Sequence, residues 1–223
     1  MNLNQFIDHT LLKADATLEQ VKVLCQEARD NNFYSVCINS YFVKAAVEFL
    51  RGSNVKVCTV VGFPLGASTM ETKRFEAMKA VAEGAKEVDM VMNISAAKSG
   101  NWQYVLDDMS SLAQVTHQQG ALLKVILETA LLTNEEKIKA CELAVKAGVD
   151  FVKTSTGFST AGATIDDIKL MRATVGPQMG VKASGGIRNT ETAKAMIEAG
   201  ATRLGTSASV DIVKGVKAGA GSY

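Results

Sequence analysis

The sequence contains few of the residues that form metal sites and disulfide frameworks. Its 223 residues include two prolines, two histidines and four cysteines, and the cysteines form no CxxC pair. The histidines, His9 and His117, lie far apart in the chain, so no spacing typical of a zinc site occurs. We therefore expect neither a metal nor a cofactor, and we interpret the cysteines as reduced thiols of a cytoplasmic protein.

Charge of one sign and long apolar runs are also scarce. The formal net charge is +1, with acids and bases spread evenly, which argues against a surface that binds nucleic acid or anionic lipid. No apolar run approaches the roughly 18 residues of a membrane span. The first ten residues, MNLNQFIDHT, lack the basic and apolar segments of a signal peptide. The expected partner is therefore a small molecule, with no nucleic acid and no membrane.

Short apolar runs alternate with amphipathic helical patterns along the whole chain. The expected strands are residues 6–10, 33–38, 55–61, 87–92, 122–127, 150–154, 180–183 and 202–206. Helical patterns such as 17–32, 68–84, 133–148 and 189–200 begin with Ser, Thr or Asn caps. Gly84, Gly148 and Gly200 end three of these patterns, as expected for left-handed C-terminal caps.

This alternation predicts a fold with parallel strands, for which two architectures compete. An open doubly wound sheet commonly has five or six strands and often a glycine-rich dinucleotide loop, and no GxGxxG occurs here. About eight βα units favour a single (β/α)8 barrel over residues 1–223. No segment resembles an interdomain linker, and the small residues of the tail, about 218–223, predict flexibility.

Four of the expected strands carry a charged residue between apolar neighbours: Asp89, Lys124, Lys153 and Lys182. A single lysine there would most simply extend from a strand end to water. Four similar placements favour a polar network inside the barrel, whereas Glu87, at a strand start, is expected to be solvated. Burial and a like charge both lower the pKa of a lysine, and a neutral amine is a nucleophile toward carbonyls. The pattern predicts Schiff-base chemistry at Lys153.

Glycine-rich turns follow the lysine strands and the last strand. They contain Gly157, then Gly185 and Gly186, and finally Gly205 with Ser207. Each turn alone is an ordinary βα connection. Because barrel loops after strands seven and eight commonly bind phosphate through backbone N–H groups, the set predicts a phosphate site.

The segments FVKTSTGF around Lys153, GVKASGGIR around Lys182 and EVDMVMN around Asp89 resemble the deoxyribose-phosphate aldolase family, in the same order. IDHTLLK, LKVILET and the terminal Tyr223 extend the resemblance over nearly the whole chain. It implies a (β/α)8 barrel that reversibly cleaves 2-deoxy-D-ribose 5-phosphate, used in deoxyribonucleotide catabolism, and a possible homodimer or higher homo-oligomer.

The resemblance also implies roles for individual residues. Lys153 forms the Schiff base, Lys182 tunes its amine, and Asp89 serves with Lys182 as proton donor and acceptor. Asp8, Lys124 and Cys37 fall at positions that line the same cavity, and Tyr223 is implied to move a proton at the enamine carbon.

The sequence departs from the family pattern at Phe158, where a lysine is expected, and at Ala208, where a serine is expected. The phosphate site is then expected to depend on backbone N–H groups and on Arg188. A transaldolase-like Schiff-base barrel, a non-covalent sugar-phosphate isomerase and an inactive binding barrel remain the alternatives. Three lysines at the centre fit a non-covalent isomerase poorly. An inactive binding protein has no reason to bury an unpaired amine.

Overall fold

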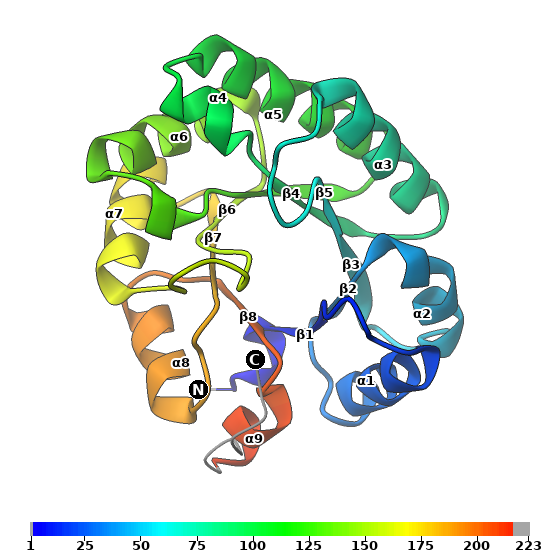
Figure 1. The fold of residues 1–223 in the computed structure, drawn as a ribbon. Coiled ribbons are helices and arrows are strands. Elements are labelled where there is room, and N and C mark those ends of the chain that lie inside the picture. Colours follow the sequence, from blue (N-terminus) through cyan, green and yellow to red (C-terminus); the bar gives the residue numbers. More distant parts are fainter. Residues whose placement is uncertain (1, 216–223) are drawn as a thin grey trace.

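The computed structural model describes residues 2–215 as a closed barrel of eight parallel strands, each paired with its neighbours in sequence order and the last with the first (Figure 1). The expected (β/α)8 barrel is thereby confirmed, and the alternative of an open sheet is excluded. The expected tail at 218–223, with Tyr223, lies outside the described residues. The strands are β1 (Ile7–Leu11), β2 (Ser35–Ile38), β3 (Lys56–Val61), β4 (Glu87–Val91), β5 (Leu122–Ile126), β6 (Phe151–Lys153), β7 (Gly180–Ser184) and β8 (Arg203–Thr206).

Helices surround the barrel and follow the strands in the chain. They are α1 (Leu18–Asp30), α2 (Val43–Phe49), α3 (Met70–Ala82), α4 (Ile94–Lys98), α5 (Trp102–Gln118), α6 (Asn134–Ala147), α7 (Ile165–Val175), α8 (Thr190–Glu198) and α9 (Ser209–Lys214). Three short 3-10 turns occupy Asn4–Phe6, Ser40–Phe42 and Thr129–Leu131. No helix within residues 2–215 is long and apolar enough to cross a membrane.

Local sequence explains where several helices begin and end. Thr17 and Thr133 each accept a backbone N–H at the start of α1 and α6 and complete a capping box with the residue three positions on. Gly148 ends α6 with φ 72°, in the left-handed region that glycine adopts without steric cost. The sequence signals for these helix ends are therefore confirmed.

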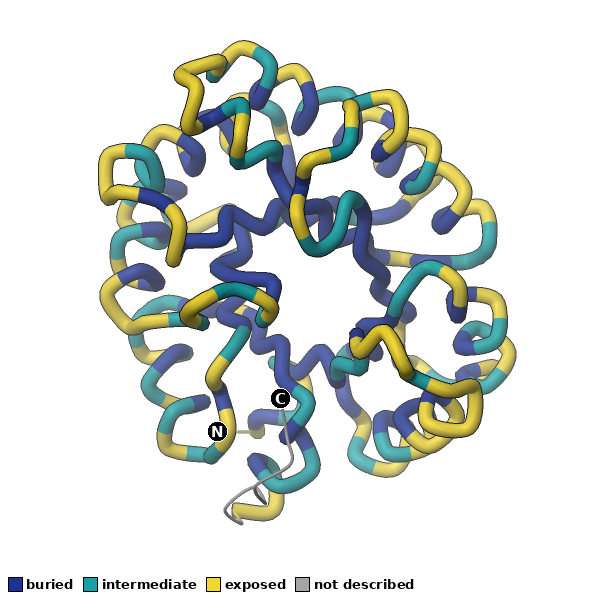
Figure 2. The backbone as a smooth tube through the Cα atoms, in the orientation of Figure 1, coloured by how far each residue is buried: buried dark blue, intermediate teal, exposed yellow. Residues whose placement is uncertain are grey.

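The main apolar core lies between the strands and the helices, which leaves the barrel interior for other side chains. Val88, Val152 and Val181 are fully buried in this core together with helix residues such as Ala140. In Figure 2 the ring of strands is dark blue, and the exposed residues lie on the outer sides of the helices. Since strand neighbours point in opposite directions, the residues next to these valines face the barrel axis.

Candidate active site

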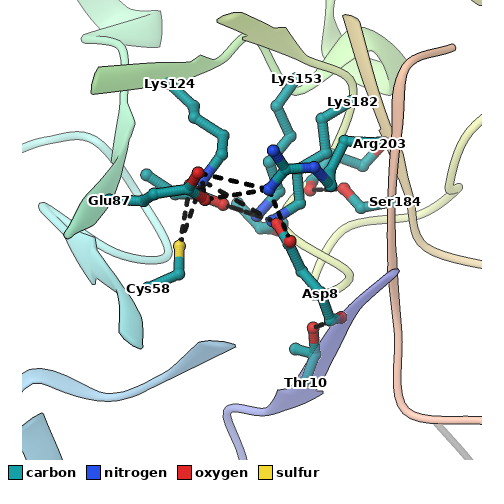
Figure 3. A network of polar contacts seen from close by, with 12 residues as sticks. Asp8, Thr10, Cys58, Glu87, Lys124, Lys153, Lys182, Ser184 and Arg203 are labelled. Atoms are coloured by element: carbon teal, nitrogen blue, oxygen red, sulfur yellow. Dashed lines mark hydrogen bonds and ion pairs between the residues drawn. The ribbon is translucent and has the colours of Figure 1, made fainter. Parts of the chain in front are cut away.

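The inward residues of six strands form one connected network of charges (Figure 3). It contains three carboxylates and four basic groups, all at most 5% exposed. The carboxylates are Asp8, Glu87 and Asp89, and the basic groups are Lys124, Lys153, Lys182 and Arg203. The expected polar network is present, and it is larger than the sequence indicated.

Asp89, on β4, is the centre of the network. Its Oδ2 accepts hydrogen bonds from Lys153 Nζ at 2.8 Å and from Lys182 Nζ at 2.9 Å, and its Oδ1 accepts one from Lys124 Nζ at 2.8 Å. Burial disfavours the carboxylate, but the charges of these three lysines outweigh it and hold the pKa of Asp89 well below its ordinary value. Asp89 is therefore an anion in a fully buried site.

Lys182, on β7, is the basic group nearest to Lys153 in the sheet, where the two are register partners. It donates to Asp89 and also to Asp8 Oδ2. Burial opposes the charge on Lys182, but the two carboxylates outweigh burial and raise the pKa of its amine above the ordinary value. Lys182 thus stays charged beside Lys153.

Glu87 corrects one expectation. It is 1% exposed, and its Oε2 lies 2.6 Å from Lys124 Nζ and 3.1 Å from an Arg203 terminal nitrogen. The first residue of β4 faces inward because Asp89, two positions later, does so. Arg203 also lies 3.5 Å above the Tyr34 ring and 2.9 Å from Asp8 Oδ1. Sequence reasoning missed Arg203, although it breaks an apolar strand as the three lysines do.

Two thiols complete the interior. Cys58 Sγ lies 3.2 Å from Asp89 Oδ1 and 3.3 Å from Lys124 Nζ, and burial raises the pKa of the Cys58 thiol well above its ordinary value. Cys37 is its register partner on β2 and is also fully buried. Cys37, Cys58 and Asp89 offer ligand atoms within 4.8 Å of one another. The lysine amines on Asp89 repel a metal cation, so this group fits a metal poorly.

Lys153 joins the network to a cavity of about 480 Å³ at the carboxyl end of the strands. It is the last residue of β6, and its side chain lines this cavity. Among the seven charged groups of the network, the cavity lining includes Lys153 alone. Within residues 2–215, its one ion pair is with the Asp89 oxygen that it shares with Lys182. A substrate carbonyl in the cavity would meet this amine first.

The predicted phosphate residues all line this cavity: Gly157, Gly185, Gly186, Gly205 and Ser207. Ser207 Oγ is buried and has no hydrogen-bond partner within residues 2–215, so its hydroxyl is available to a ligand. Arg188, which was expected at the phosphate site, also lines the cavity, and so do Lys13 and Gln20, which sequence reasoning missed. Lys13 lies two residues after β1, where the strand-end position is the signal that identifies it.

At two of these positions, packing also requires a glycine. A Cβ on Gly205 would lie 3.0 Å from Lys182 Cε, so this glycine leaves room for the lysine side chain. A Cβ on Gly185, which has φ +82°, would lie 2.9 Å from Gly162 Cα, where two loops cross. These two glycines therefore shape the site by leaving room for the neighbouring groups.

Phe158 lies on the same cavity wall and is 44% exposed. Its ring meets Phe63, in the loop after β3, edge-on at 5.3 Å between centroids. An apolar contact between two loops thus lies where the family pattern has a lysine. Ala208, which follows Ser207 and precedes α9, is buried, and its methyl group offers no hydrogen bond to a ligand.

A parallel eight-stranded barrel with a buried lysine facing a cavity at the carboxyl end of a strand fits a barrel enzyme whose amine attacks a carbonyl compound. The family model described as "DeoC/LacD family aldolase" matches residues 3–221. The chain belongs to this family of aldolases, which are carbon–carbon lyases.

Individual relatives agree with this assignment over the full length. A protein of Brevibacillus brevis named deoxyribose-phosphate aldolase is 61% identical over 223 residues, covering all of both chains. One of Aciduliprofundum boonei with the same name is 59% identical, covering 95% of this chain and 96% of its own. The crystal structure of a putative deoxyribose-phosphate aldolase from Coccidioides immitis is 43% identical with a TM-score of 0.93. The match covers 96% of this chain and 85% of that one. The deoxyribose phosphate aldolase from Aeropyrum pernix, described as having a "unique tetrameric structure", is 35% identical with a TM-score of 0.90. The match covers 95% of this chain and 89% of that one.

Proposed function

We propose that this aldolase reversibly cleaves 2-deoxy-D-ribose 5-phosphate into acetaldehyde and D-glyceraldehyde 3-phosphate through a Schiff base at Lys153. The observation that carries the proposal is the charge count of the interior. Four basic groups contact three carboxylates, so the charges balance when one base is neutral. Lys153 has one shared carboxylate contact and faces the cavity, which makes it the base best placed to act as a neutral nucleophile.

The reaction follows from this arrangement. The Lys153 amine adds to the C1 aldehyde of the open-chain sugar, and loss of water forms an iminium. When the C3 hydroxyl loses its proton, the C2–C3 bond breaks and its electron pair moves into the iminium, which becomes an enamine. Glyceraldehyde 3-phosphate leaves, the enamine carbon takes a proton, and water releases acetaldehyde. Lys153 donates a hydrogen bond to Asp89, and Lys182 donates to the same Asp89 oxygen. Asp89 and Lys182 therefore carry the protons of these steps.

Covalent trapping tests the role of Lys153. The protein is incubated with acetaldehyde, reduced with borohydride and digested, and the modified peptide is identified by mass spectrometry. We expect the label on Lys153 alone, and no label in a Lys153→Met variant, which nearly keeps the side-chain length and, like the neutral amine, adds no charge. A label on Lys182 or Lys124 would contradict the assignment. Release of free acetaldehyde from the sugar phosphate distinguishes this reaction from a transaldolase-like exchange.

We also infer that the phosphate group binds beside Gly157, Gly185, Gly186, Gly205 and Ser207. The unpartnered Ser207 hydroxyl and the positive-φ glycines of these loops support this site. Phe158→Lys adds a positive charge to the wall and should lower KM for the phosphorylated sugar and make it more sensitive to salt. Phe158→Met serves as the uncharged control. An unchanged KM would place the phosphate elsewhere in the cavity.

Finally, we infer a cytoplasmic homo-oligomer formed by one domain of residues 1–223. The four buried free cysteines fit a reducing compartment, and the Aeropyrum pernix relative is described as tetrameric. Light scattering after gel filtration tests the state, and a monomeric mass at micromolar concentration would contradict it.

A further inference from the structure

Glu128, between β5 and the 3-10 turn Thr129–Leu131, has an unusual backbone. Its φ is 57°, and within residues 2–215 Asn32 is the other non-glycine residue with positive φ. Asparagine tolerates this region, whereas glutamate adopts it at a steric cost. Glu128 is also 2% exposed. Such a conformation persists when surrounding contacts hold it, and it occurs preferentially at functional sites.

Backbone hydrogen bonds on both sides attach Glu128 to the segment that carries the nucleophile. The N–H of Leu127 donates to the carbonyl of Lys153 at 2.9 Å, and the N–H of Thr129 donates to the carbonyl of Thr154 at 3.0 Å. The left-handed residue between them turns its side chain toward the loop after β6. The backbone is therefore held at the residues where the Schiff base would form.

The Glu128 carboxylate binds one residue of that loop, Thr156. The Thr156 N–H lies 3.3 Å from both carboxylate oxygens, and the Thr156 hydroxyl donates to Oε2. The same hydroxyl oxygen accepts the Phe158 N–H at 3.0 Å. Thr156 lines the cavity together with Lys153. An ionised carboxylate only accepts hydrogen bonds, so with Glu128 ionised the hydroxyl proton of Thr156 points at Glu128 and not at the cavity.

We propose that Glu128 is a positioning residue that makes Thr156 an acceptor for a hydroxyl group of the substrate. With its proton held by Glu128 and one lone pair used by Phe158, Thr156 Oγ presents its remaining lone pair to a ligand. That lone pair accepts a hydrogen bond from a sugar hydroxyl and repels an acceptor such as a carbonyl or phosphate oxygen. This proposal rests on the proposed function, because it assigns recognition of the hydroxylated part of that substrate.

Glu128→Gln is the informative variant because it keeps the volume and replaces one acceptor by an N–H donor. When the amide oxygen accepts the Thr156 N–H, the amide NH2 donates to Thr156 Oγ and releases the hydroxyl proton toward the cavity. We expect kcat/KM for 2-deoxyribose 5-phosphate to fall about 10- to 100-fold, as for a mispaired buried polar group. Trapping of acetaldehyde at Lys153 should stay within about twofold, since acetaldehyde has no hydroxyl.

Variants of Thr156 separate positioning from general support of the loop. Thr156→Val should show the same loss on the sugar phosphate, and Thr156→Ser should restore most of the activity. Glu128→Gln combined with Thr156→Val should be no worse than Thr156→Val alone, because both remove one interaction. Glu142→Gln, on an exposed position of α6, is the matched control and should behave as the wild type.

The hydroxyl itself is tested in the direction of synthesis. Glyceraldehyde 3-phosphate and 3-oxopropyl phosphate differ by one hydroxyl, and each is offered with acetaldehyde. The wild type should prefer the hydroxylated acceptor, and Glu128→Gln should lose about tenfold of that preference. The proposal would be overturned if Glu128→Gln lowered acetaldehyde trapping, the rates with both acceptors and the unfolding midpoint to the same extent. Additive effects of Glu128→Gln and Thr156→Val on kcat/KM would also overturn it. If Glu128→Gln does not fold, an unchanged preference in Thr156→Val would overturn it. Failure of the wild type to trap acetaldehyde would instead contradict the proposed function.

Discussion

Two buried lysine–carboxylate sites in this molecule behave in opposite ways. Between α3 and α5, Lys73 Nζ lies 2.6 Å from Asp108 Oδ2, with side chains 0% and 1% exposed. Burial there lowers the pKa of Lys73 and raises the pKa of Asp108, against the attraction between the two charges. Inside the barrel, with equal or greater burial, the pKa of Lys124 is raised and that of Asp89 is lowered.

The difference lies in the number of opposite charges around each group. In the outer pair, one carboxylate contacts one amine, and this single attraction does not compensate for desolvation. In the barrel, three amines contact Asp89, and two carboxylates lie within 2.8 Å of Lys124. Several partners compensate for burial where one does not. In this molecule a buried charge is therefore stabilised where several opposite charges surround it, and the surplus base of such a cluster can serve as a nucleophile.

The largest expected effect comes from removing the shared carboxylate. Asp89→Asn leaves three amines without their common anion and should lower the free energy of unfolding by about 3–5 kcal/mol. Asp108→Asn should cost less, about 2 kcal/mol, because Lys73 can release its proton. Urea unfolding at pH 7 measures both. Equal costs would show that partner number does not set the behaviour of the two sites.

Activity should separate the same two sites. Asp89→Asn should reduce kcat/KM about 10²- to 10⁴-fold, the usual contribution of a group that transfers protons. Asp108→Asn, which touches no residue of the cavity, should change kcat/KM by no more than its effect on the folded fraction. Comparable losses in steady-state cleavage assays would place Asp108 in the mechanism.

Removing the charged neighbour of Lys153 should move the pH dependence. Lys182→Leu should lower cleavage at pH 7 and shift the pH–rate profile to higher pH by about one to three units, because a positive neighbour no longer favours the neutral amine. Lys73→Leu is the control, since it removes a buried lysine from the outer pair, and its profile should keep its position. Loss at every pH would assign Lys182 to direct proton transfer, and an unchanged profile would remove it from the mechanism.

The two sites should also differ in how acid affects stability. Lysine and arginine charges outweigh burial and lower the pKa of Asp8, so its stabilising contribution is complete above the unfolded value near 3.8 and is lost as pH falls. Asp108 has a raised pKa, so its folded form binds a proton first, and its contribution grows as pH falls toward 4. The cost of Asp8→Asn should shrink by about 1 kcal/mol between pH 5 and 3, and that of Asp108→Asn should not. Parallel slopes in urea titrations would contradict these directions.

An ion pair on the surface should have the smallest effect on stability, and it is the reference for the two buried lysine–carboxylate sites. Arg51 donates to Glu48 at 2.6 Å on the outside of α2, with side chains 76% and 59% exposed. Arg51→Ala should change the free energy of unfolding by less than about 0.5 kcal/mol, because solvent screens the pair. A larger change would mean that Arg51 packs on the surface through its alkyl chain.

Sequence alone determined the repeating βα units and the direction in which their residues point. The apolar runs, the helix caps and Gly148 are local signals, and each acts within a few residues of where it is found. The placement of Asp89, Lys124, Lys153 and Lys182 inside the barrel followed from the same local rule, because alternate strand residues face opposite sides.

Closure of the barrel decided which of these groups meet. Asp8 and Lys182 are separated by 174 positions in the chain, and they touch because β1 and β7 both pair with β8. Glu87 was expected to be solvated because it begins a strand, although alternation with Asp89 places it inward, and Lys124 and Arg203 stabilise its buried charge only in the closed barrel. The left-handed turn at Glu128 has no local signal, since glutamate seldom adopts it. Charge pairing and strain depend on neighbours from distant segments, so they exist only once the tertiary structure has formed.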